Sequence, residues 1–136
     1  MFDTSNNALH VALLILRIGF GVIFVLHGWP KIIGGVDTWS GLGGAMGVVG
    51  LDFAPAFWGF MAALAEFAGG LLLVFGFLVR PAAALLLITM LVAVLMHSAQ
   101  GDALSNILHP LKGLVVFIVL LYSGAGKYSL DRRFAK

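Results

Sequence analysis

The chain has 136 residues, of which 61% are hydrophobic and only 10% are charged, and its mean hydropathy is +1.07. Soluble domains carry about 25% charged residues, so this composition indicates an integral membrane protein. The absence of cysteine excludes disulfides and thiolate metal sites within the chain, and the net charge of +2 is too small to suggest nucleic-acid binding.

Four apolar segments predict membrane-spanning helices, over residues 9–29, 54–77, 81–98 and 110–124. About 20 residues at 1.5 Å each cross a bilayer core, so the last segment is short. The first segment has no basic region before it and no small-residue cleavage site, so we expect it to be retained rather than removed as a signal peptide. The predicted fold is an all-α, integral membrane four-helix bundle that forms one domain over residues 1–136.

The connections between these segments differ in composition. The first, "GGVDTWSGLGGAMGVVGLD", is rich in glycine, and we expect at most a short interfacial helix that begins near Thr38 with Asp37 as its cap. The second is a tight turn, "FLVRPAA", in which Pro81 suits the first turn of the next helix.

Lysine and arginine residues predict the orientation in the membrane. Arg80 and four residues of the C-terminal tail lie on one side, whereas only Lys31 and Lys112 lie on the other. Cytoplasmic loops carry the excess of basic residues, so we expect both termini to face the cytoplasm.

Two charges of opposite sign, Arg17 and Glu66, lie inside the predicted spans. A charge at the bilayer centre costs about 2.5–3.5 kcal/mol on insertion scales. Both residues lie roughly 18 Å from the outer ends of their helices at 1.5 Å per residue, so we predict that they form an ion pair. The pair would either fix the helix register or floor a polar cavity. Small residues beside these charges would allow the helices to pack closely, namely Gly21, Gly28, Gly69 and Gly70.

A second polar layer is expected near the outer face. It comprises His27 and Lys31 at the end of the first span, His97 at the end of the third, Asp102 and Asn106 in the following loop, and His109 and Lys112 at the start of the fourth. Amines and imidazoles there would suit an anion or the oxygens of a quinone. The three histidines show no tight ligand spacing, so no metal is expected. The plain alternative is that these side chains extend to the interface and cap loops.

These residues resemble the DoxX family of small four-helix membrane proteins. The similarity runs from about Leu14 to Arg132 and is carried by four stretches, "LRIGFGVIFVLHGWPKIIG", "LAEFAGGLLLVFGFLVRPAA", "MHSAQGDALSNILHPLKGLVVFIVLL" and "GAGKYSLDR". The family pattern implicates Arg17, Gly28, Lys31, Glu66, Gly70, Gly76, Arg80, His97, Asn106, Lys112 and the group Tyr128, Ser129 and Asp131. The resemblance implies a bacterial inner-membrane protein linked to quinone-dependent redox chemistry. Its partners would be other redox subunits.

Three functions follow as hypotheses. The first is an enzyme or subunit of a quinone-linked redox system, with a ligand bound by His27, Lys31, Glu66, His97, Asn106 and Lys112. The second is a non-catalytic scaffold that anchors a larger membrane complex. The third is a small carrier of protons or anions. It is the weakest of the three hypotheses because four helices leave little room for transport. No residue is assigned a catalytic role, and the cofactor stays open, with quinone as the candidate.

Overall fold

The computed structural model describes residues 4–134, and in this range it is all helical. Its elements are α1 (Thr4–Ile33), α2 (Gly35–Gly43), the 3₁₀ helix η1 (Gly44–Val49), α3 (Pro55–Phe75), α4 (Val79–Ala99), α5 (Leu104–Ser123) and α6 (Leu130–Phe134). Four of them, α1, α3, α4 and α5, are long and apolar enough to cross a membrane. The predicted all-α fold with four membrane-spanning helices is confirmed.

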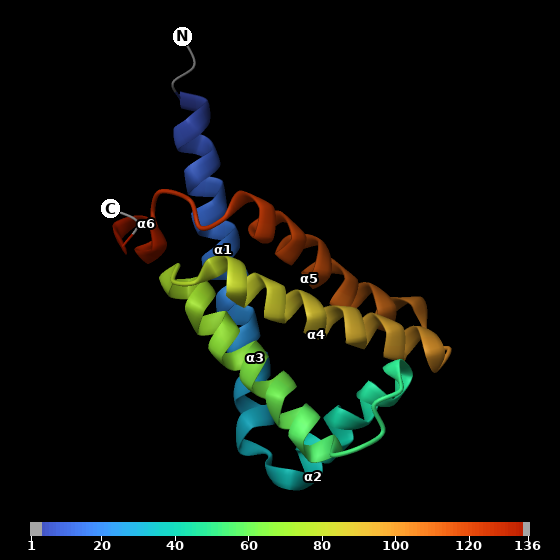
Figure 1. Ribbon diagram of the computed structural model, residues 1–136. Coiled ribbons are helices and arrows are strands. Elements are labelled where there is room, and N and C mark those ends of the chain that lie inside the picture. The colour runs from blue at the N-terminus through green and yellow to red at the C-terminus, as the bar shows by residue number, and fades with distance from the viewer. Residues whose placement is uncertain (1–3, 135–136) are drawn as a thin grey trace.

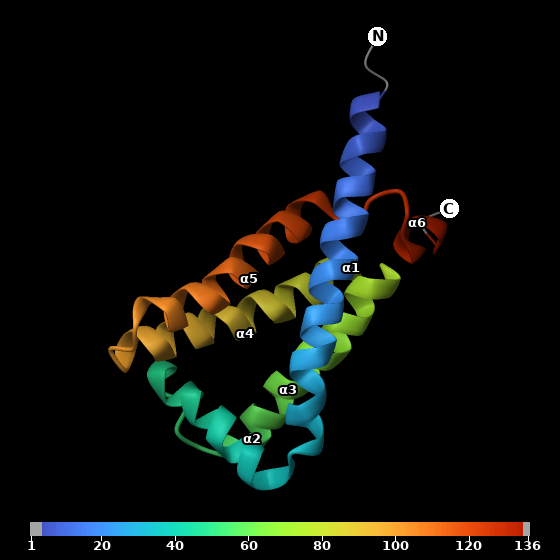
Figure 2. The ribbon, with the colours of Figure 1, turned by 180° about the vertical axis from the view of Figure 1, so that it is seen from behind.

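The long helices form two antiparallel pairs, α1 with α3 and α4 with α5 (Figures 1 and 2). A tight turn joins α3 to α4, and the two pairs diverge from that turn. At the opposite end, α2 and η1 run from the end of α1 across α3 to the far end of α4. The buried core lies between the two helix pairs and includes residues of α1, α3, α4 and α5. It includes Leu73, Val79, Leu86, Phe117 and Leu120, which are fully buried.

Close helix contacts are made at small residues. In the α1–α3 pair, a Cβ atom on Gly28 would lie 2.5 Å from the backbone nitrogen of Phe67, and one on Gly70 would lie 2.7 Å from the carbonyl oxygen of Gly21. Gly69 instead faces Leu86 of α4, at 3.1 Å. Small residues bring helix backbones together in this way in lipid, and they set the register of α1 against α3.

Two predicted boundaries were wrong. The short helix expected near Thr38 is present as α2, but it begins at Gly35, so Asp37 lies in its first turn rather than at its cap, and η1 extends the helical structure to Val49. The fourth spanning helix begins at Leu104 instead of Pro110, which is buried inside the helix. A proline removes one backbone donor and is tolerated where packing holds the helix.

Candidate functional site

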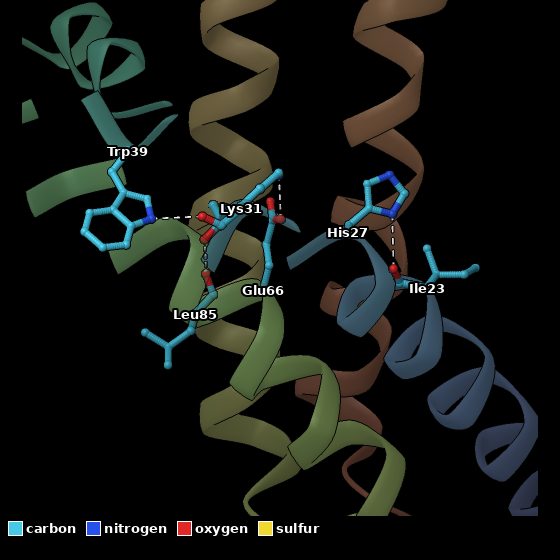
Figure 3. Close-up of polar contacts among 7 residues, drawn as sticks. Ile23, His27, Lys31, Trp39, Glu66 and Leu85 are labelled. Carbon is cyan, nitrogen blue, oxygen red and sulfur yellow. Dashed lines mark hydrogen bonds and ion pairs between the residues drawn. The ribbon is translucent and has the colours of Figure 1, made fainter. Parts of the chain in front are cut away.

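The central ionic contact joins the last turn of α1 to the middle of α3. Lys31 Nζ lies 2.5 Å from Glu66 Oε2 (Figure 3), and the two side chains are 28% and 6% exposed. The indole Nε1 of Trp39 donates to the carbonyl oxygen of Lys31 at 2.9 Å. This bond ties α2 to the end of α1, just after Pro30, and so holds the lysine backbone in place. The intramembrane carboxylate is therefore neutralised by a lysine rather than by Arg17.

Arg17 lies elsewhere and makes a different contact. It is 1% exposed, and its Nη2 donates to the carbonyl oxygen of Tyr128 at 2.6 Å. Its guanidinium packs against Gly76, where a Cβ atom would lie 1.3 Å from Nη1. Among the described residues no ion pair joins Arg17 to Glu66, which corrects the predicted pair.

Arg17 and Glu66 are kept apart by the register of α1 against α3. Because Gly28 packs on Phe67, residues 28–31 of α1 are the ones level with Glu66. Arg17 lies earlier along α1, by roughly 18 Å at 1.5 Å per residue. The predicted pair requires the outer ends of the two helices to lie level with each other. In the structure α2 packs on the first turns of α3, around Gly59, so α1 meets α3 farther along.

A cavity of about 640 Å³ lies between α3 and α4 and reaches the end of α1, α2 and η1. Its walls are mainly apolar. The lining comprises Lys31, Gly41, Leu42, Ala45, Met46, Trp58, Met61, Ala62, Leu64, Ala65, Glu66, Ala68, Leu85, Ile88, Thr89, Val92, Ala93, Met96 and His97. The Lys31–Glu66 pair thus supplies charge to an otherwise apolar chamber.

Two further polar groups belong to this lining. The buried Nε1 of Trp58 has no hydrogen-bond partner among the described residues. A buried N–H without a partner is costly, which makes it a candidate donor to a ligand. The ring of His97 is held by Asp102, with 2.6 Å between Nδ1 and Oδ2, which leaves Nε2 available. The cavity therefore combines an ammonium, an indole N–H and an imidazole.

The remaining residues of the predicted outer layer do not line this cavity. Asn106, His109 and Lys112 are exposed on α5. His27 is exposed on α1, where its Nδ1 donates to the carbonyl oxygen of Ile23 at 3.1 Å (Figure 3). Its ring lies 5.8 Å from that of His109. Of the six predicted ligand residues, the structure brings together only Lys31, Glu66 and His97. The predicted layer is divided because Asn106, His109 and Lys112 lie on α5, which contributes no residue to the cavity lining.

Sequence reasoning missed the walls of the cavity. Leu85, Thr89, Val92 and Met96 recur at helical spacing along α4 and present one stripe to the chamber. This signal was present in the sequence, but it does not differ from the pattern of an ordinary packed helix face. In residues 4–134, no group of three or more His, Cys, Asp or Glu side chains could hold a metal ion.

The fold and this site define a class of protein: a small membrane protein whose divergent helix pairs leave a half-open apolar cavity between α3 and α4, with an ion pair in its wall. The sequence pattern of the DoxX family matches residues 12–99, and the chain belongs to that family. The resemblance seen in its motifs is confirmed.

Several bacterial proteins are similar over nearly the whole chain. "Inner membrane protein YqjF" of Escherichia coli (strain K12) is 35% identical over 130 residues, which cover 93% of this chain and 94% of the relative. "Inner membrane protein YphA" of the same strain is 34% identical over 134 residues, 90% of each chain. "Putative oxidoreductase CatD" of Bacillus subtilis (strain 168) is 26% identical over 126 residues, 93% of this chain and 89% of the relative. No solved structure matches the chain.

Proposed function

We propose that this protein is an inner-membrane component of a quinone-linked redox system and that it binds the quinone ring in the cavity between α3 and α4. The observation that carries the proposal is that Lys31, Trp58, Glu66 and His97 all line one otherwise apolar cavity. The names of its relatives support the location and, for one of them, a redox role.

The chamber suits a flat apolar ring with oxygen atoms on its edge. Small-molecule sites measure about 300–1,000 Å³ and combine apolar walls with a few polar groups, which agrees with the cavity of about 640 Å³. Lys31 Nζ and Trp58 Nε1 would donate to the carbonyl oxygens, while Met61 and Met96 would pack on the ring. The isoprenoid tail would extend into lipid.

Reduction of a quinone to a quinol takes up two electrons and two protons. In the lining, Glu66 and His97 are the side chains suited to exchanging protons with the ring oxygens. The electrons would come from another redox subunit of the same membrane. The proposal therefore assigns to this chain the binding of the ring and the transfer of protons.

The alternative hypothesis is a scaffold without a ligand. A scaffold needs no polar groups in an apolar cavity, because each polar group placed there costs free energy of desolvation. A buried ion pair in the wall of such a cavity would add a cost in desolvation and bring no function.

The experiment measures binding of a short-chain ubiquinone to the purified protein by quenching of its tryptophan fluorescence. K31M should weaken binding at least tenfold, because it removes an amine donor and keeps the length of the side chain. A65L, which reduces the cavity without touching a charge, should do the same. K112M is the matched control and should bind as the wild type does, since Lys112 lies outside the cavity.

Two results would contradict the proposal. One is wild-type binding by A65L in a folded protein. The other is a loss of quinone binding in K112M together with unchanged binding in K31M. That result would place the quinone in the outer polar layer predicted from the sequence. The scaffold hypothesis predicts no quinone binding by any of the four proteins.

A further inference from the structure

A hollow of about 450 Å³ lies at the end of the bundle that carries both termini. It is lined by Lys127, Tyr128, Arg132 and Arg133, which belong to α6 and to the segment that follows α5. Figures 1 and 2 both place α6 beside the turn between α3 and α4. The hollow is separate from the cavity between α3 and α4 and shares no residue with it.

The backbone around this hollow is held firmly. Asp131 accepts hydrogen bonds from the backbone nitrogens of Leu78, at 2.7 Å, and Val79, at 3.0 Å, and its own nitrogen donates to the carbonyl oxygen of Gly76 at 2.9 Å. From the other side, buried Arg17 donates to the carbonyl oxygen of Tyr128 at 2.6 Å. The basic side chains therefore extend from a fixed backbone rather than from a loose tail, and little ordering is needed when they bind a ligand.

The charge at this end is strongly one-sided. Among the described residues, Arg17, Arg80, Lys127, Arg132 and Arg133 lie here with a single carboxylate, that of Asp131. That carboxylate already accepts hydrogen bonds from the backbone N–H groups of Leu78 and Val79 at the start of α4. In residues 4–134 no salt bridge includes Lys127, Arg132 or Arg133. Three cations thus surround the hollow without a counter-ion from the described part of the chain.

The position of the hollow indicates where its anion comes from. α3 ends at Phe75 and α4 begins at Val79, so the hollow lies level with the ends of membrane-spanning helices. Lipid headgroups occupy this level of a bilayer. The aromatic side chains of Tyr122 and Phe134 are 81% and 75% exposed nearby, as is usual at a membrane interface.

We infer that this hollow binds the headgroup of an anionic phospholipid. Its phosphodiester would lie between Arg132 and Arg133, whose planar guanidinium groups suit phosphate oxygens. Lys127 Nζ, which lies 4.9 Å from the centre of the Tyr128 ring and bonds to Asn7, would flank the headgroup. The acyl chains would lie along the apolar surface at the end of α3, which Figures 1 and 2 place beside α6 and where Phe75 is 61% exposed.

The test compares three probes by native mass spectrometry of the full chain in detergent: dioctanoyl phosphatidylglycerol, dioctanoyl phosphatidylcholine and inorganic phosphate. The wild type should bind phosphatidylglycerol at least tenfold more tightly than phosphatidylcholine. Each basic residue near a membrane surface contributes about fivefold to the binding of anionic lipid. R132Q/R133Q should therefore bind phosphatidylglycerol about 20-fold more weakly, while K112Q, which removes a charge at the other end, should not change it.

Equal binding of the two lipids by the wild type would overturn the inference, as would undiminished binding of phosphatidylglycerol by folded R132Q/R133Q. Displacement of the lipid by inorganic phosphate at equal concentration would show a site for free anions instead. If the double variant does not fold, R133Q alone replaces it, with an expected loss of about fivefold.

Discussion

Removal of either partner of the Lys31–Glu66 ion pair should destabilise the protein, and removal of both should restore most of the loss. The variants are K31M, E66L and K31M/E66L, in which apolar side chains of similar volume replace the charges. The pair is suited to this test because its atoms lie 2.5 Å apart and because the two side chains differ in exposure, 28% for Lys31 and 6% for Glu66.

The magnitudes follow from that geometry. At 2.5 Å the gross attraction is about 7 kcal/mol for an effective dielectric constant of about 20, and desolvation of the charges offsets most of it. K31M leaves a carboxylate buried without a partner and should cost about 3–5 kcal/mol of unfolding free energy. E66L should cost less, about 1–3 kcal/mol, because the more exposed lysine can turn its ammonium toward water. The double variant should lie within about 1 kcal/mol of the wild type.

The assay is unfolding in mixed micelles with increasing dodecyl sulfate, followed by far-ultraviolet circular dichroism. K112M, a change of the same kind at an exposed position, should lie within about 0.5 kcal/mol of the wild type. If the free-energy loss of the double variant equals the sum of the two single losses to within about 0.5 kcal/mol, the two residues are independent and the pairing is refuted. A parallel cycle with R17M and E66L should be additive, because Arg17 bonds to Tyr128 instead.

Three further predictions concern the ends of the helices. G76A should cost about 2 kcal/mol or more in the same unfolding assay, because Gly76 has a φ of +69° and a Cβ atom there would meet the buried guanidinium of Arg17. The control G19A, in open space within α1, should be neutral or slightly stabilising. Equal effects of the two changes would contradict the packing of Arg17 on Gly76. D131A should cost about 1–2 kcal/mol, because α4 loses the acceptor of its first N–H groups, whereas D37A, which removes no cap, should stay within about 0.5 kcal/mol. A reporter fused after Lys136 should be active only in the cytoplasm, and activity outside it would reverse the proposed orientation.

Much of the fold could be predicted from local sequence signals. Runs of apolar residues long enough to cross a bilayer predict helices, because every backbone polar group in lipid must be paired within its own segment. The predicted helix boundaries were wrong at a glycine-rich segment and at a proline, where the local signal for a helix is weak. The glycine-rich residues 35–49 form α2 and η1 because they pack on α3 and α4. The helix α5 continues through Pro110 because that residue is itself buried. Tertiary contacts outweigh local propensity at both places.

The amino-acid sequence by itself determined that the charges inside the membrane must find partners, since the cost of an unpaired charge in lipid does not depend on the arrangement of the helices. Only the tertiary structure decided which partners they have. The contact of Gly28 with Phe67 sets the register of α1 on α3, and this register gives Glu66 to Lys31 and leaves Arg17 to the carbonyl oxygen of Tyr128. A position along a helix gives depth only relative to the end of that helix, and where the ends lie depends on packing between segments far apart in the chain.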